Sequence, residues 1–100
     1  MEERRAYLRT PAPQLMVRAD GHLFPTIEWS QGNLVVACDG SYRVGSLVSI
    51  DAVGTDAGNL QAVGIRGRVT RVTDGGAAAV DFLHRDDAAM IVLRELADTL

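Results

Sequence analysis

The sequence has no lysine, a single cysteine and no long apolar run, and each of these absences narrows what the protein can be. Because Cys38 is the only cysteine, the chain cannot form an internal disulfide. The histidines and this cysteine show none of the spacings, such as CxxC or HxxxH, that hold a zinc ion. No apolar run approaches the ~18 residues that a membrane-spanning helix needs. We therefore predict no metal or other cofactor, no membrane insertion and a cytoplasmic location.

Catalytic groups are scarce as well. Nucleophilic catalysis needs a base beside the nucleophile, but His22 lies in a predicted turn and His84 lies just before a predicted helix, and neither has a catalytic motif around it. The pair Asp86-Asp87 is explained by the start of that helix, where negative charge is favourable. The sequence supports no reaction class, and we predict that the protein is not an enzyme.

Positive charge is present only as arginine. All ten basic residues are arginines, whose planar guanidinium groups suit phosphates and stack on flat rings. The formal net charge is -3, so the overall field favours neither DNA nor an acidic membrane surface, and we predict no DNA binding. A grip on an anionic ligand must come from a local cluster, and Arg4, Arg5 and Arg9 form one near the N-terminus.

The length of 100 residues predicts a single domain that is large enough to fold alone. Short runs rich in Val, Ile, Leu and Thr alternate with Gly, Asp and Asn turn signals, a rhythm typical of an all-β sandwich or barrel. The predicted turns are Asp20-Gly21, Gln31-Gly32, Asp39-Gly40, Gly54 to Gly58 and Asp74-Gly75-Gly76. The predicted strands are Gln14 to Ala19, Leu23 to Trp29, Asn33 to Cys38, Ser46 to Ala52, Leu60 to Val72 and Ala77 to Leu83.

The pattern becomes helical at the end of the chain. Apolar residues fall three or four positions apart from Ala89 to Leu100, and no Gly or Pro interrupts them. We therefore predict a C-terminal helix over 85–100. The charged residues before Pro11 lack amphipathic order, so residues 1–12 are interpreted as an N-terminal arm that leads into a domain of residues 13–100.

Two expectations concern the direction of side chains in the strands. In an extended segment Trp29 faces away from Glu28 and Ser30, so we expect it in the core. Arg66 and Arg68 share one face of a strand, which we expect to be exposed to solvent.

Two short elements of the sequence carry a resemblance to a known family. Arg5-Ala6-Tyr7-Leu8-Arg9 is an RxxxR element, and Glu28 to Asn33 has the layout of a carboxylate, a serine and a turn residue. Together they resemble the PilZ domain family, which is marked by RxxxR followed by (D/N)xSxxG. Three later segments are also similar to strands of that family, so the resemblance covers almost the whole chain; they are Val44 to Ile50, Ile65 to Val69 and Val80 to Leu83.

The resemblance implies a six-stranded antiparallel β-barrel with a C-terminal helix, and non-catalytic binding of cyclic di-GMP. By position, Arg5 and Arg9 would bind the phosphates and guanines, and Arg4 would add a third guanidinium. The residues that would line a guanine site on the barrel are Glu28, Ser30 and Asn33. Binding would order the arm against the barrel and so signal to a partner protein or an attached domain.

Two residues depart from the motif of the family. Glu28 stands where Asp or Asn is usual, and Asn33 replaces the closing glycine, where its tolerance of left-handed geometry would preserve the turn. A second register, with Asp39, Ser41 and Gly45, keeps the acid and the serine but is one residue too long. An alternative function stays open, that of an adaptor that binds a protein partner without the nucleotide.

Overall fold

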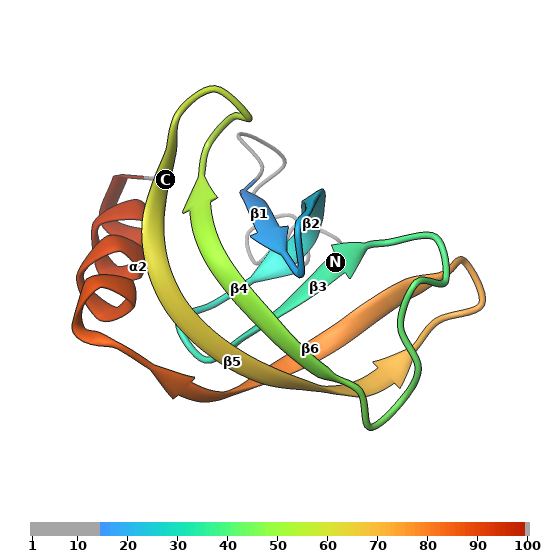
Figure 1. Ribbon diagram of the computed structural model, residues 1–100. Coiled ribbons are helices and arrows are strands. Elements are labelled where there is room, and N and C mark those ends of the chain that lie inside the picture. The colour runs from blue at the N-terminus through green and yellow to red at the C-terminus, as the bar shows by residue number, and fades with distance from the viewer. Residues whose placement is uncertain (1–14, 100) are drawn as a thin grey trace, which may run out of the picture.

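The computed structural model describes residues 15–99, which form a closed barrel of six antiparallel strands and one helix. The elements are β1 (Met16–Ala19), β2 (His22–Trp29), β3 (Asn33–Ala37), β4 (Leu47–Gly54), β5 (Leu60–Val72), β6 (Ala77–Arg85) and α2 (Asp87–Thr99). The strands follow the order β1-β2-β3-β6-β5-β4, and β4 closes the barrel against β1 (Figure 1). The predicted six-stranded barrel with a C-terminal helix is confirmed, and the bounds of its elements differ from the predicted ones by at most two residues.

Two of the predicted turns have the backbone that tight hairpins require. The φ angles are 51° and 85° at Asp20 and Gly21, and 53° and 78° at Asp39 and Gly40. Positive φ at both central residues is the mark of the type I′ turn, whose twist matches that of the strands it joins. The Asp20-Gly21 turn connects β1 to β2, and the Asp39-Gly40 turn follows β3. In both places the residue types that tolerate this backbone made the turn readable from sequence.

The core lies inside the barrel, where alternate residues of each strand point inward. Thr26 is the only polar side chain buried among the described residues, and its hydroxyl donates a hydrogen bond of 2.8 Å to the carbonyl of Leu15. Trp29 is half-buried and packs against this core, in agreement with the expectation from sequence. The fully buried side chains of largest volume are Leu15, Val17, Leu34, Val36, Ile50, Val53, Ile65, Val69, Val80 and Leu93.

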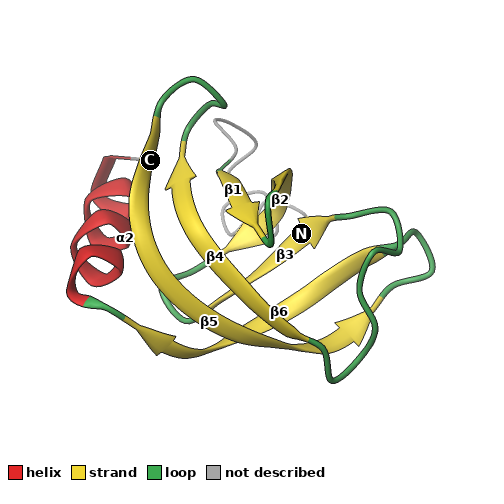
Figure 2. Cartoon of the chain, viewed as in Figure 1, coloured by secondary structure: helices red, strands yellow, loops and turns green. Residues whose placement is uncertain are grey.

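Helix α2 packs against β5 and β6 and lies along one side of the barrel (Figure 2). Its start is fixed by Asp86, whose Oδ1 accepts a hydrogen bond of 2.8 Å from the backbone N–H of Ala89. The backbone N–H of Asp86 donates in turn to the carbonyl of Gly64 on β5, at 2.9 Å. The hydrogen bond from Ala89 is the main cause that lowers the pKa of the Asp86 carboxyl below its ordinary value. One aspartate therefore caps the helix and ties it to the barrel.

Candidate functional site

The predicted binding residues divide between the arm and the barrel. Arg4, Arg5 and Arg9 lie outside the described residues. The barrel half, which comprises Glu28, Ser30 and Asn33, lies at the connection between β2 and β3.

Ser30 organises this connection. Its Oγ accepts hydrogen bonds from the backbone N–H groups of Gly32 and Asn33, at 3.1 Å and 3.2 Å. Its hydroxyl lies 3.1 Å from Oδ1 of Asn33, to which it can donate, and the backbone N–H of Ser30 donates to the carbonyl of Asn33 at 2.8 Å. Ser30 and Asn33, three positions apart in the sequence, thus form one hydrogen-bonded unit at the surface.

Asn33 does not have the backbone that the sequence led us to expect. It is the first residue of β3, and neither Asn33 nor Gly32 has a positive φ. The connection closes through the hydroxyl of Ser30, so a left-handed residue is not needed at either position. The replacement of the family's closing glycine by Asn33 consequently carries no backbone strain here. The side chain of Asn33 is exposed, and within the described residues its amide nitrogen makes no hydrogen bond.

Two residues of β6 donate hydrogen bonds to the β2–β3 connection. The backbone N–H of Phe82 donates to the carbonyl of Gly32 at 3.0 Å, and a guanidinium N–H of Arg85 donates to the carbonyl of Gln31 at 2.5 Å. Arg85 therefore brings a cation to the connection from 54 residues away in the chain. Sequence reasoning missed Arg85, because no local pattern marks a contact that depends on which strand neighbours β3. Glu28 is exposed near the end of β2 and pairs in register with Val35.

The second register, Asp39-Gly40-Ser41 with Gly45, lies beyond the opposite end of β3. The hydroxyl of Ser41 donates to the carbonyl of Cys38 at 2.6 Å, and Gly40 donates its N–H to the carbonyl of Gly76 at 2.9 Å. The polar groups of this segment thus close their own turn and join it to the β5–β6 hairpin.

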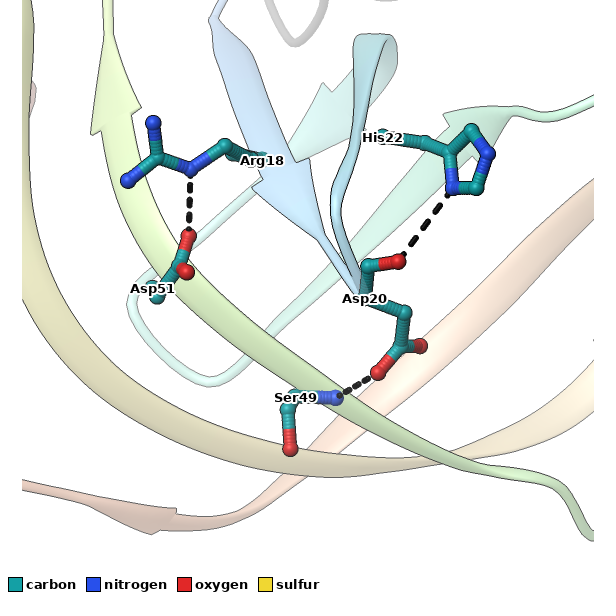
Figure 3. A network of polar contacts seen from close by, with 5 residues as sticks. All are labelled: Arg18, Asp20, His22, Ser49 and Asp51. Atoms are coloured by element: carbon teal, nitrogen blue, oxygen red, sulfur yellow. Dashed lines mark hydrogen bonds and ion pairs between the residues drawn. The ribbon is translucent and has the colours of Figure 1, made fainter.

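A second polar network lies on the barrel surface around the β1–β2 turn. The two carboxylate oxygens of Asp20 accept hydrogen bonds from the hydroxyl of Tyr42 at 2.7 Å and from the backbone N–H of Ser49 at 3.3 Å. Figure 3 shows Asp20 with Ser49, and beside them the ion pair of Arg18 with Asp51, whose Nε and Oδ1 atoms are 2.8 Å apart. Burial, followed by the bond to Asp20, raises the pKa of Tyr42 well above its ordinary value. These contacts fasten the turn to β4 and to the loop before it.

The other ionisable groups of the described residues do not gather into a metal centre. Among residues 15–99, no three His, Cys, Asp or Glu side chains come together in a way that could hold a metal ion. Nδ1 of His22 lies 3.2 Å from the carbonyl of Asp20. In the same part of the chain, no helix is both long and apolar enough to cross a membrane.

Comparison of the sequence with protein-family models finds no matching family, and comparison with curated proteins finds no match. The fold and the candidate site therefore rest on the residues and contacts described above.

Proposed function

We propose that the protein is a non-enzymatic receptor domain for cyclic di-GMP, in which arginines of the arm and the β2–β3 connection hold the ligand between them. The observation that supports this most is the unit formed by Ser30 and Asn33, which presents a carboxamide at the barrel surface. Guanine offers two acceptors, N7 and O6, and a donor amino group. A carboxamide and a carboxylate can match both kinds of group, because one donates and the other accepts.

The two halves of the proposed site have different tasks. Glu28, Ser30 and Asn33 read the guanine, while Arg5 and Arg9 neutralise the phosphates and stack on the bases. With a net charge of -3, the chain gives an anionic ligand little general attraction, so affinity depends on these arginines. On binding, the arm closes on the barrel and changes the surface that a partner protein or an attached domain contacts.

The direct test is calorimetric titration with cyclic di-GMP, accompanied by thermal unfolding. At a ligand concentration of one hundred times Kd, binding stabilises the fold by about 2.7 kcal/mol, which for a domain of this size raises the melting temperature by roughly 10–20 °C. Arg5→Ala and Arg9→Ala should each remove this stabilisation. Arg94→Ala, at an exposed position of α2, is the matched control and should leave it unchanged. The absence of binding at high micromolar ligand would refute the proposal.

Substitutions in the β2–β3 connection separate guanine recognition from folding. Asn33→Ala removes the carboxamide and should weaken cyclic di-GMP about tenfold, since a good base contact is worth about 1–3 kcal/mol. Asn33→Gly restores the family's glycine and serves as the comparison. Tighter binding by Asn33→Gly than by the wild type would mean that the side chain of Asn33 obstructs the ligand and does not read it.

The second candidate function is an adaptor that binds a protein partner without the nucleotide. It is favoured by the departures from the family's motif at Glu28 and Asn33. A partner whose binding ignores cyclic di-GMP and survives both Arg5→Ala and Arg9→Ala would support this function over the first.

A further inference from the structure

The outer surface of the barrel has a hollow where β4, β5 and β6 lie side by side. Its volume is about 340 Å³, and it overlies Val48 and Gly67. The side chains around it come from all three strands; they are Leu47, Ser49, Arg66, Arg68, Leu83 and His84. The register explains this grouping, because Arg66 pairs with both Ser49 and His84, and Arg68 pairs with Leu47.

Two leucines make this hollow unusually apolar for an exposed sheet face. Leu47 is 65% exposed and Leu83 is 58% exposed, although both are large hydrophobic side chains. They stand on the strands that flank β5, at either side of the arginines. Single exposed apolar residues are ordinary, so these leucines matter here because they flank one hollow together with two arginines.

The two arginines of the hollow lack a counterion within the described part of the chain. No ion pair joins Arg66 or Arg68 to a carboxylate there, in contrast to the pair of Arg18 with Asp51. Among residues 15–99, no carboxylate lines the hollow. Because Arg66 and Arg68 project from the same face of β5, their positive charges reinforce each other in a chain that is acidic overall.

We propose that this hollow is a docking site for an acidic segment of a partner protein, which places an apolar side chain between Leu47 and Leu83 and its carboxylates on Arg66 and Arg68. Guanidinium groups bind carboxylates through paired, charge-assisted hydrogen bonds. Arginine is enriched among energetically important interface residues, and the buried centre of an interface is more apolar than its rim. Charge complementarity thus selects the kind of partner, and the leucines supply the anchor.

The shape of the hollow favours a polypeptide over a free small molecule. Sites for small ligands enclose most of the ligand surface, whereas both leucines here remain more than half exposed. A polypeptide covers the hollow and its rim together. This inference is independent of cyclic di-GMP, because none of the residues that line the hollow belongs to the β2–β3 connection.

The test uses the full chain and two-dimensional amide NMR spectra, with a capped peptide of sequence Gly-Glu-Phe-Glu-Gly as the probe. We expect its addition to shift the amide signals of the lining residues, with those of Leu47, Arg66 and Leu83 foremost. Two matched peptides separate the contributions: one replaces glutamate by lysine, and the other replaces phenylalanine by alanine. Each should bind at least fivefold more weakly than the probe.

Variants assign the interaction to the hollow. Arg66→Gln combined with Arg68→Gln should weaken the probe peptide at least fivefold, whereas Arg71→Gln, at an exposed position of the same strand outside the hollow, should not. A dispersed amide spectrum shows that each variant is folded. Three results would overturn the proposal: no shifts at millimolar peptide, equal weakening by Arg71→Gln, or binding of 4-phenylbutyrate as tight as that of the peptide, which would make a small amphipathic anion the occupant.

Discussion

Gly67 is a buried position of β5 where the barrel wall leaves no room for an added methyl group. Gly67 faces the core, and its neighbours Arg66 and Arg68 face the outside of the barrel. The register between β5 and β6 shifts between Arg66 and Gly67. A Cβ at this position would lie 2.5 Å from Cγ1 of Val80 and 2.9 Å from the carbonyl oxygen of Asp81. Both distances are shorter than a normal van der Waals contact, and Val80 is fully buried, so the core has little room to yield.

Gly67→Ala should therefore lower the free energy of unfolding by about 2 kcal/mol, within the range of 1–3 kcal/mol that overpacking costs. For a domain of about this size, this corresponds to a fall in melting temperature of roughly 8–16 °C. Urea unfolding followed by the fluorescence of Trp29, the only tryptophan, measures the change. Gly58→Ala is the control, because its nearest contact is 3.5 Å away and its φ is not positive.

A double-mutant cycle identifies the contact responsible. Val80→Ala removes the methyl group nearest to the new Cβ, so Gly67→Ala should cost about 1 kcal/mol less in that background than in the wild type. The close approach to the carbonyl of Asp81 remains, so the cost should not vanish. Two results would contradict this explanation: strictly additive costs of Gly67→Ala and Val80→Ala, or a cost of Gly67→Ala in the wild-type background that is no larger than the cost of Gly58→Ala.

Three further substitutions test the polar contacts of the fold. Thr26→Val should cost about 1 kcal/mol in urea unfolding, because the carbonyl of Leu15 loses the hydroxyl but keeps the backbone N–H of the same residue as a donor. Asp86→Asn should destabilise the protein at neutral pH, because folding lowers the pKa of this carboxyl. The difference in stability from the wild type should shrink as the pH falls from the ordinary aspartate pKa through the lower folded-state value. Tyr42→Phe removes the hydrogen bond to Asp20, and folding raises the pKa of the Tyr42 phenol. The contribution of the phenol to stability should therefore be complete below the ordinary tyrosine pKa and disappear as the pH rises through the folded-state value.

Each of these substitutions has an outcome that its explanation does not allow. A loss well above 2 kcal/mol for Thr26→Val would show that the hydroxyl contributes more than its one hydrogen bond to the carbonyl of Leu15. If the difference in stability between the wild type and Asp86→Asn stays the same in acid, the charge of the carboxylate does not contribute to the helix cap. Likewise, a wild type that keeps its advantage over Tyr42→Phe in strong alkali would contradict a role for the neutral phenol.

The strands, turns and helix could be predicted from the sequence because their signals are local, whereas the local pattern left a sandwich and a barrel both open. Asp20-Gly21 and Asp39-Gly40 mark turns through their own tolerance of positive φ, which the structure confirms. The capping role of Asp86 was likewise visible from the charge and the helical spacing that follows it. These features depend on residues within a few positions of each other, so neither the strand order nor the register is needed to predict them.

The arrangement of the surface could not be read in the same way. The hollow joins Leu47, Arg66 and Leu83 only because β5 lies between β4 and β6 in one particular register. Arg85 reaches the β2–β3 connection for the same reason. At Asn33 the local signal misleads: the residue type predicts a left-handed backbone, but the hydroxyl of Ser30 makes that conformation unnecessary.

The position of Asp81 relates the two proposed sites to each other. On β6 it pairs in register with Asn33 of β3 on one side and with Arg68 of β5 on the other. Its carboxylate is exposed and forms no ion pair with Arg68. It therefore opposes an anionic ligand at either site, although neither site uses it as a contact.

Asp81→Asn should consequently tighten the binding of both the acidic peptide and cyclic di-GMP. An exposed charge at this range is worth about 0.2–1 kcal/mol, so the gain should be at most about fivefold and should decline as salt is added. Asp74→Asn, which removes the same charge from the β5–β6 hairpin, controls for net charge. Equal gains from the two variants would reduce the effect to overall charge. If Asp81→Asn binds one ligand more weakly, Asp81 is a direct contact in that site, because removing the charge of a repulsive neighbour can only raise the affinity.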